Sequence, residues 1–400
     1  MNGKRFILLV LDGVGAGALP DAAAFGDAGH DTLGNLARHQ GGLDLPNLQE
    51  LGLGNLHAIQ GVPPHPSPRA SWGRMVEKSQ GKDSTLGHWE LVGLVTPVAL
   101  PTYPDGFPTG LVEAWTRACG LTGVLGNCVA SGTEIIERLG AEHLAGGRPI
   151  LYTSADSVFQ VATHEELFPL ARLYQICETA RALLTGEHAV ARVIARPFLG
   201  QPGAFARTPN RRDFSLPPWA PTALDRAAAA GVEVVSIGKI RDLFAGVGIE
   251  RALGSKGNME GLDALERLLD EGPPAGRDQL VLLNLVDFDM LWGHRLDPTG
   301  FRGGLEALDR RLPQVLERLG ARDLLVITAD HGNDPTSGST DHSREHVPLL
   351  AYRAGSPGRD LGLRACFADV GATLLDWFGL EAPAVGCSFL GEMSPPSLDL

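Results

Sequence analysis

The last third of the chain carries carboxylates and imidazoles at spacings that suit a metal centre. Asp289 stands five residues before His294, Asp330 directly precedes His331, and His342 follows shortly after. Mixed oxygen and nitrogen ligands favour Mn²⁺, Zn²⁺ or Fe²⁺, whereas all-oxygen sets favour Mg²⁺ or Ca²⁺. Any one of these histidines alone is better explained by a structural role, but the set predicts metal binding.

Asp12, near the N-terminus, adds a sixth candidate ligand. Six ligands are too many for one open tetrahedral catalytic site. They suit two ions ~4 Å apart, which together clamp the attacking and leaving oxygens of phosphoryl transfer. The candidate ligands therefore predict two-metal phosphoryl-transfer chemistry.

A side-chain nucleophile for such chemistry is offered by residues 81–90, Gly-Lys-Asp-Ser-Thr-Leu-Gly-His-Trp-Glu. The hydroxyls of Ser84 and Thr85 lie there in a polar turn bounded by glycine. A hydroxyl bound to a metal loses its proton more easily and attacks phosphorus in line. The alternative is a helix cap, because Asp and Ser both favour that position, and the local sequence alone favours the cap.

Three apolar runs each end at aspartate, and they position these groups. They are 6–11 before Asp12, 280–286 before Asp287 and Asp289, and 324–329 before Asp330. Near-continuous aliphatic runs are typical of parallel strands that are buried on both faces. Ligands of open parallel sheets bind beyond the carboxyl ends of the strands. We therefore expect the four carboxylates to converge at one edge of a sheet.

Helical patterns separate these runs and predict a layered α/β core. The expected helices cover 222–230, 258–269, 305–319 and 367–378, and a further strand covers 232–237. The fold class predicted is α/β, with a mostly parallel central sheet flanked by helices.

The middle of the chain differs in composition, because it is richer in proline and glycine and its apolar runs are shorter. Helices are expected there at 109–118 and 165–184, and strands at 150–153 and 191–195. Proline-rich stretches bound it on both sides. We interpret residues 98–216 as a smaller α/β domain inserted into a core made of 1–97 and 217–400, with two linkers that allow a hinge.

Composition excludes several other classes of protein. The 400 residues include 34 Lys and Arg against 47 Asp and Glu, a net charge of −13, which argues against a nucleic-acid partner. No apolar run approaches the ~20 residues that cross a bilayer, so no membrane partner is expected. No cleavable signal follows the N-terminus, and five scattered cysteines without a CxxC pair predict reduced thiols in a cytoplasmic protein.

The loop 13–18, Gly-Val-Gly-Ala-Gly-Ala, fits a dinucleotide-binding fingerprint but lacks its context. Pro20 and Asp21 interrupt the helix that should follow. A nicotinamide-dependent dehydrogenase is therefore a distant alternative, and we expect these glycines to let the backbone pass close to a metal or phosphate.

Over essentially its whole length the sequence resembles the phosphopentomutases, a branch of the alkaline phosphatase superfamily. The motifs that carry the resemblance are 81–84 with 87–90, 153–158, 207–211, 284–289 with 293–295, 328–335 and 338–342. The resemblance implies an isomerase that interconverts ribose 1-phosphate, or its 2-deoxy form, with ribose 5-phosphate in nucleoside salvage. It also implies a phosphoenzyme, a ribose 1,5-bisphosphate intermediate, two Mn²⁺ ions and an inserted domain that caps the metal site.

The resemblance also implies roles for individual residues. One metal is held by Asp12, Asp330, His331 and the nucleophile, and the other by Asp289, His294 and His342. The nucleophile position falls on Ser84, where the family usually has threonine. Serine supplies the same oxygen, and Thr85 remains the rival after a shift of one residue.

Substrate contacts are implied mainly on the inserted domain. Asp156 would bind a ribose hydroxyl, Arg192, Arg207 and Lys239 would clamp the non-reacting phosphate, and Ser154, Val158 and Ile194 would line the same pocket. Guanidinium groups suit this role because they form bidentate bonds to phosphate oxygens. His88 and Trp89 are expected to support the nucleophile loop. Glucose 1,6-bisphosphate or ribose 1,5-bisphosphate is the expected activator.

Two other functions would use the same candidate metal ligands. One is an enzyme similar to cofactor-independent phosphoglycerate mutase or a metal-dependent phosphatase, and the motifs at 153–158 and 207–211 argue against it. The other is a sugar-phosphate-binding protein without catalysis, which the complete set of ligands and a hydroxyl nucleophile disfavours. The partners expected are small sugar phosphates, and the oligomeric state stays open.

Overall fold

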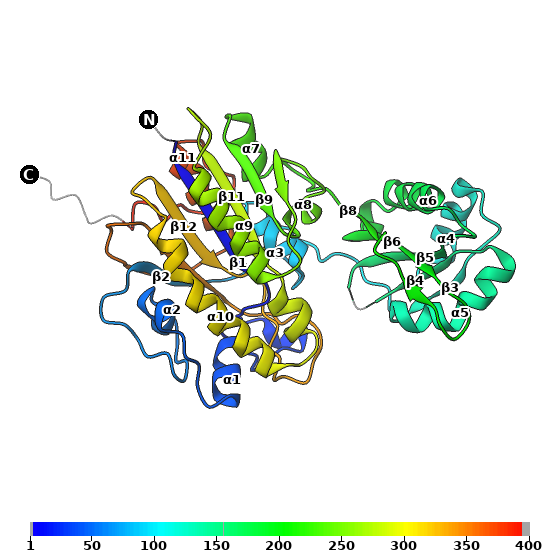
Figure 1. Ribbon diagram of the computed structural model, residues 1–400, viewed down its shortest axis with the longest axis horizontal. Coiled ribbons are helices and arrows are strands. Elements are labelled where there is room, and N and C mark those ends of the chain that lie inside the picture. The colour runs from blue at the N-terminus through cyan, green and yellow to red at the C-terminus, as the bar shows by residue number, and fades with distance from the viewer. Residues whose placement is uncertain (1–2, 155, 394–400) are drawn as a thin grey trace, which may run out of the picture. The chain divides into compact units, whose positions relative to one another are not determined.

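A computed structural model describes residues 3–154 and 156–393, which fold into two compact units (Figure 1). The inserted unit is Ala99–Pro217, and the core unit is built from the chain before and after it. The chain passes between the units at Val98–Ala99 and at Pro217–Pro218, both within the proline-rich stretches. In the part of the chain that the structure describes, no helix has the length and apolar character needed to cross a membrane.

The core unit is built around an eight-stranded sheet. Its strands in spatial order are β10 (Arg251–Leu253), β9 (Glu233–Ile237), β11 (Gln279–Leu285), β1 (Arg5–Leu11), β12 (Asp323–Thr328), β13 (Val347–Tyr352), β2 (Ala70–Met75) and β14 (Asp360–Arg364). Neighbours from β10 to β12 are parallel, β13 is antiparallel to both of its neighbours, and β14 is parallel to β2. The predicted α/β core with a mostly parallel sheet is confirmed.

The register of the three central strands explains why they deliver side chains to one edge. Leu11 of β1 pairs with Leu285 of β11, and Val10 pairs with Thr328 of β12, so the three strands end at the same level. Every residue of these strands is buried. Uniform burial requires helices on both faces of the sheet, as the aliphatic runs predict.

Helices cover both faces of the central strands. On one face lie α9 (Asn258–Glu271) and α10 (Pro298–Glu317), seen in front of the sheet in Figure 1. On the other face α3 (Ser84–Leu91) contacts α11 (Ala368–Phe378), which also contacts α7 (Ala223–Ala229). Adjacent residues of β11 show the two sides, because Leu283 faces Gly261 of α9 whereas Asn284 meets His88 of α3.

The smaller helical elements of the core unit lie in its connections. They are η1 (Ala22–Phe25), α1 (Thr32–His39), α2 (Pro46–Glu50), η2 (Leu53–Asn55), α8 (Ile240–Leu243) and the π-helical turn η4 (Phe288–Gly293). The stretch after β1 forms a loop and then η1, so the long helix that a dinucleotide fingerprint requires does not follow that strand.

The inserted unit has its own sheet and its own apolar clusters. Its elements are α4 (Thr109–Cys119), β3 (Leu125–Val129), α5 (Gly132–Gly146), β4 (Ile150–Thr153), β5 (Val158–His164), α6 (Leu170–Leu183), η3 (Gly186–His188), β6 (Arg192–Leu199), β7 (Ala206–Arg207) and β8 (Arg212–Ser215). The sheet order is β3-β4-β5-β6-β7, with β8 also paired to β6. One cluster contains Trp115 and Phe159, and the other contains Tyr152 and Phe198.

Some predicted boundaries are wrong for local reasons. The helix expected at 165–184 begins only at Leu170, because Pro169 is its N-cap and the residues before it form a turn. The strand expected at 191–195 continues to Leu199. The helix expected from residue 305 begins at Pro298, where Asp297 caps the first turn by accepting the Gly300 N–H.

Candidate metal centre and nucleophile

The central strands place three carboxylates at one edge of the core sheet. Asp12 follows β1 and Asp330 follows shortly after β12, and both are 0% exposed. Asp289 follows β11 and is 6% exposed. The fourth predicted carboxylate does not join them, because Asp287 accepts the Asn258 N–H at the start of α9. The expectation of four converging carboxylates is therefore corrected to three.

The π-helical turn η4 brings Asp289 and His294 together. The His294 N–H donates to the Asp289 carbonyl five residues earlier, at 3.0 Å. This wider turn places the two side chains on the same side, so that His294 Nε2 lies 3.2 Å from Asp289 Oδ2. Single π-helical turns are frequent at functional sites for this reason.

The three candidate histidines share one hydrogen-bonding pattern. Nδ1 of His294 faces the Thr340 carbonyl at 2.7 Å, Nδ1 of His331 faces that of Gly332 at 3.0 Å, and Nδ1 of His342 faces that of Lys82 at 2.9 Å. A carbonyl only accepts hydrogen bonds, so Nδ1 carries the proton in each ring. Nε2 is then the nitrogen that faces the cluster and binds a metal when it carries no proton, which is the arrangement that metal-binding histidines adopt.

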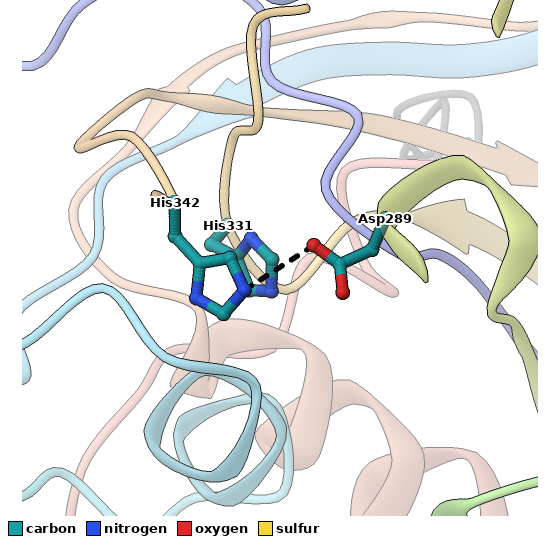
Figure 2. A group of neighbouring side chains, drawn as sticks. All are labelled: Asp289, His331 and His342. Atoms are coloured by element: carbon teal, nitrogen blue, oxygen red, sulfur yellow. Dashed lines mark ion pairs between the residues drawn. The ribbon is translucent and has the colours of Figure 1, made fainter. Parts of the chain in front are cut away.

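These side chains form two groups with metal-ligand spacing. One contains Asp12, Asp330 and His331, and the other contains Asp289, His331 and His342. Figure 2 shows the second group, in which the rings of His331 and His342 stack with centroids 3.9 Å apart and Asp289 faces them. The sequence assigned His331 to the first metal alone, whereas in the structure its ring lies between both groups.

The donor set fits divalent cations. Both carboxylate oxygens of Asp12 and Oδ2 of Asp330 are buried and face cationic or imidazole side chains: Lys239 pairs with Asp12, and His88 Nδ1 lies 3.1 Å from Asp330 Oδ2. His342 Nε2 also lies 3.2 Å from His294 Nε2, so two nitrogens whose protons are on Nδ1 face one another. Nitrogen lone pairs and buried carboxylates this close together favour a cation between them.

Neighbouring charges shift the pKa values of Asp330 and His331. Burial works to raise the pKa of Asp330, but His331 and His88 outweigh it, and the pKa is lowered far below its usual value. Burial works to lower the pKa of His331, but Asp330, Asp289 and Asp12 raise it to about 10. Without a metal, the cluster therefore holds a proton on His331 in place of a cation.

Ser84 stands at the first position of α3, directly after its N-cap. Asp83 accepts the N–H groups of Thr85 and Leu86, at 2.9 and 3.1 Å, and so caps the helix. The cap interpretation and the nucleophile interpretation are thus compatible, because the cap is Asp83 and the hydroxyl beside the candidate ligands is that of Ser84. Its Oγ lies 3.1 Å from His331 Nε2. Thr85 is 5% exposed, and no contact of its hydroxyl with the ligands is found among the described residues.

His88 supports both the nucleophile and a ligand from within α3. Its Nδ1 lies 2.8 Å from the Ser84 carbonyl and 3.1 Å from Asp330 Oδ2, and its Nε2 is 3.3 Å from Asn284 Nδ2. The side chain is 2% exposed. Trp89 is fully buried and donates to the Leu243 carbonyl. His88 thus contacts the residue that carries the nucleophile, whereas Trp89 anchors α3 to Leu243 of α8.

Lys239 lies at this centre, in the core unit. Its Nζ donates to Ser84 Oγ at 3.0 Å and forms an ion pair with Asp12. Burial works to lower the pKa of Lys239, but Asp12, Asp289 and Asp330 raise it above its usual value. The ammonium group therefore stays charged beside the nucleophile, whereas the sequence analysis grouped Lys239 with two arginines of the inserted unit.

The remaining candidates lie on the inserted unit. Val158 pairs with Arg192 in the parallel ladder of β5 and β6, and Ile194 lies two residues beyond Arg192 on the same face of the sheet. Arg207 pairs with Phe198 at the other end of β6, so the backbone does not bring the two arginines of the expected clamp together. Ser154 and Asp156 flank Ala155, which lies outside the described residues.

Several supporting residues have no signal in the sequence beyond their place in a ligand loop. Asn333 donates to Asp289 Oδ1 at 2.7 Å. A Cβ on Gly13, which has φ +76°, would lie 2.9 Å from the Asn333 Cβ and 3.6 Å from Asp289 Oδ1. The glycine loop therefore lets the backbone approach the ligand residues, and any other side chain there would displace Asn333.

Three comparisons find known proteins to which this chain is similar. A model of the metalloenzyme superfamily matches residues 4–382. Proteins named phosphopentomutase are 57% identical in Anaeromyxobacter sp. (strain K), over 98% of this chain and 99% of that protein, and 52% identical in Desulfitobacterium hafniense (strain DSM 10664 / DCB-2), over 98% and 100%. Among solved structures, Leishmania mexicana phosphoglycerate mutase matches with a TM-score of 0.48 at 13% identity, over 97% of each chain.

Proposed function

This chain belongs to the phosphopentomutases, and we propose that it moves a phosphate between O1 and O5 of ribose or 2-deoxyribose. The observation that carries the proposal is the position of Ser84. Its hydroxyl lies within hydrogen-bonding distance of His331, which belongs to both candidate metal groups, and of the Lys239 ammonium. A hydroxyl placed in this way is suited to accept and return a phosphoryl group.

Divalent metal is part of this chemistry, and we propose that the two ions are Mn²⁺. The residues that would hold one are Asp12, Asp330, His331 and Ser84, and those that would hold the other are Asp289, His294 and His342. When bound, the ions would neutralise charge on the phosphoryl group and lower the pKa of the Ser84 hydroxyl.

The chain's own residues suit a phosphoserine cycle. The resting enzyme carries phosphate on Ser84, and a sugar hydroxyl attacks that phosphorus. The new P–O bond forms as the bond to Ser84 Oγ breaks, and the proton of the sugar hydroxyl ends on Ser84 Oγ, which is left as a serine hydroxyl. Lys239 donates to Ser84 Oγ and so stabilises the serine alkoxide as it departs. The resulting ribose 1,5-bisphosphate turns around and returns its other phosphate to Ser84.

Substrate recognition is proposed for seven residues, of which Lys239 also donates to the nucleophile. They are Ser154, Asp156, Val158, Arg192, Ile194, Arg207 and Lys239. Arg192 is partly exposed and lies 3.6 Å from Asp213, so its guanidinium has a carboxylate partner that an incoming phosphate can replace. An enzyme that has lost its phosphate would need glucose 1,6-bisphosphate or ribose 1,5-bisphosphate. All five cysteines are free, which supports a reducing compartment such as the cytoplasm.

The test is turnover of ribose 1-phosphate with Mn²⁺ and a trace of glucose 1,6-bisphosphate, followed together with release of free phosphate. Formation of ribose 5-phosphate without free phosphate supports the mutase. Free phosphate as the main product would instead indicate a phosphatase. Binding of Mn²⁺ and ribose 5-phosphate without any turnover would indicate a binding protein.

A further inference from the structure

The nucleophile loop is held by a buried arginine that comes from a distant segment. Arg344 is 1% exposed and lies two residues after the candidate ligand His342. Its Nη1 donates to the carbonyls of Ser79 and Gly81, at 2.8 and 2.6 Å, and its Nη2 donates to the Glu77 carbonyl at 2.9 Å. All three carbonyls belong to the segment that leads directly into Ser84.

Two carboxylates and an aromatic ring surround the buried guanidinium group of Arg344. Nη1 also meets Glu77 Oε2 at 2.8 Å, Nη2 lies 3.1 Å from Asp21 Oδ2, and Nε lies 3.3 Å from the same carboxylate. The face of the guanidinium lies 4.9 Å from the Phe25 ring. The planar group thus has acceptors around it in several directions, an arrangement that the single ammonium of lysine does not reproduce.

The clamped segment has little regular structure of its own. Between Met75, which ends β2, and Ser84, which begins α3, the chain forms neither helix nor strand. Its carbonyls therefore lack the partners that a helix or strand would provide. Arg344 donates hydrogen bonds to three of these carbonyls. Arg344 thus holds the carbonyls of the segment that leads into Ser84, while Glu90 accepts the N–H groups of Lys78 and Ser79 in it.

The same two segments meet at further points. The Lys82 carbonyl accepts from His342 Nδ1 at 2.9 Å, and Lys82 Nζ pairs with Asp341 at 3.1 Å. Asp27 ties the contact together, since it accepts from Lys82 Nζ at 3.1 Å and from the Arg344 N–H at 2.9 Å. The loop that carries the nucleophile and the loop that carries a metal ligand are therefore joined along several residues.

We propose that Arg344 is a positioning residue for phosphoryl transfer, which fixes the Ser84 loop against the loop of His342. Among the described residues its guanidinium contacts no candidate metal ligand, and it acts through the carbonyls of Glu77, Ser79 and Gly81. In-line transfer depends on placement, and an error of about 1 Å at the reacting groups costs about 10²-fold in rate. The inference rests on the proposed role of Ser84.

The test compares Arg344→Lys and Arg344→Ala with a matched pair at Arg5. Arg5 is 4% exposed, pairs with Asp323 at 3.1 Å and donates to the Leu268 carbonyl, but lies at the far end of β1 from the metal centre. Each variant is compared with the wild type for its melting temperature, bound Mn²⁺, kcat and KM for ribose 1-phosphate. The rate at which glucose 1,6-bisphosphate phosphorylates Ser84 is followed by intact-protein mass.

We expect Arg344→Lys to lower kcat about 10²-fold while KM changes by less than about threefold, since the lost effect is placement in the transition state. The phosphorylation rate should fall in parallel. Added guanidinium should restore at least part of the activity of Arg344→Ala. Arg5→Lys and Arg5→Ala should melt earlier but keep kcat, and guanidinium should not affect them.

Three results would overturn the positioning role. They are a wild-type kcat in folded, metal-loaded Arg344→Lys, an equal loss of kcat in the Arg5 variants, and no recovery of Arg344→Ala with guanidinium. Failure of the proposed function is distinguishable, because it would show in the wild type as absence of isomerisation. Failure of the positioning role would instead show in the Arg344 and Arg5 variants, while the wild type still isomerises ribose 1-phosphate.

Discussion

Ser84 Oγ lies 3.1 Å from Nε2 of His331, an imidazole that belongs to both candidate metal groups. The hydroxyl stands at the first position of α3, and the helix N-terminus stabilises negative charge there. A phosphate on Ser84 would therefore lie at the positive end of the helix dipole and beside the candidate metal ligands. Thr85, one residue further into the helix, is buried.

This relationship predicts different results for the two neighbouring hydroxyls. Ser84→Ala should lower isomerisation by about 10³-fold or more, because it removes the atom that carries the phosphate. Ser84→Thr should keep activity within about tenfold of the wild type, since it adds one methyl group and keeps the oxygen. Turnover of ribose 1-phosphate and intact-protein mass after treatment with glucose 1,6-bisphosphate measure both effects.

Thr85→Ala is the matched control for that experiment, because it removes a hydroxyl one residue away. It should still be phosphorylated and should keep turnover. A phosphorylated, active Ser84→Ala protein together with an inactive Thr85→Ala protein would move the nucleophile to Thr85. That result would leave the family and the reaction unchanged.

Metal binding should release a proton at neutral pH. Without metal, burial works to lower the pKa of His331, but Asp330, Asp289 and Asp12 raise it to about 10, so His331 is protonated at pH 7. An ion that binds Nε2 must displace this proton, and apparent Mn²⁺ affinity should rise with pH by up to about tenfold per unit between pH 7 and 9. Titration calorimetry in buffers of different ionisation enthalpy counts the protons released.

The control for proton release is His331→Asn, which keeps a polar side chain but removes the imidazole. Its first ion should bind more weakly and with less proton release than in the wild type. Mn²⁺ binding to the wild type at pH 7 without any proton release would contradict the charge state assigned to His331.

The ammonium of Lys239 should affect metal binding and turnover in opposite directions. Its Nζ donates to Ser84 Oγ at 3.0 Å and pairs with Asp12, so it assists the nucleophile but competes with a metal for the carboxylate. Lys239→Met should therefore lower kcat by about 10²-fold, while Mn²⁺ affinity stays equal or increases. Steady-state kinetics and equilibrium dialysis give the two quantities separately.

Lys4→Met controls for loss of a lysine, because the Lys4 ammonium donates to the Trp377 carbonyl at the other end of β1. It should leave both kcat and metal affinity unchanged. If Lys239→Met weakened Mn²⁺ binding, the claim that the ammonium competes with the metal for Asp12 would be refuted.

The aspartates at strand ends show what a sequence can predict about this fold. Asp12 and Asp330 were placed correctly because uniformly aliphatic strands must be buried and parallel, and parallel strands end at one edge. Asp287 and Asp289 stand two residues apart after the same strand, and the strand pattern alone places both at the sheet edge. In the structure Asp287 is kept away from the metal centre, because its carboxylate accepts the backbone N–H of Asn258.

Contacts between distant segments account for most of what the sequence left open. The proximity of Lys239 to Ser84 spans 155 positions, and that of Arg344 to Gly81 spans 263. Each depends on how several loops cross above the sheet, and no periodicity or motif encodes that crossing. The position of His331 between both metal groups has the same origin, because it depends on how three strand ends are aligned.

Glu345 predicts a pH dependence of stability. Its side chain is 1% exposed, and burial raises its pKa from the usual 4.5 to about 7, although hydrogen bonds from Ser343 and Thr32 work to lower it. Between pH 4.5 and 7 the native state therefore keeps a proton that the unfolded chain releases. The free energy of unfolding falls as pH rises through this window, and the full loss, about 3 kcal/mol at most, is present above pH 7.

Glu345→Gln should remove this contribution, because glutamine imitates the protonated acid. Its amide oxygen can accept the Thr32 N–H that now meets Oε2 at 2.8 Å, and its amide NH₂ can donate to the hydroxyls of Thr32 and Ser343, which lie 2.7 Å from Oε1. The variant should match the wild type near pH 5 and be more stable than it near pH 8. Urea unfolding at both pH values measures this difference, and Glu50→Gln, at an exposed ion pair with Arg69, should show none. A Glu345→Gln effect of the same size at pH 5 and pH 8 would mean that Glu345 is ionised in the native state throughout, because only a retained proton makes the two differences unequal.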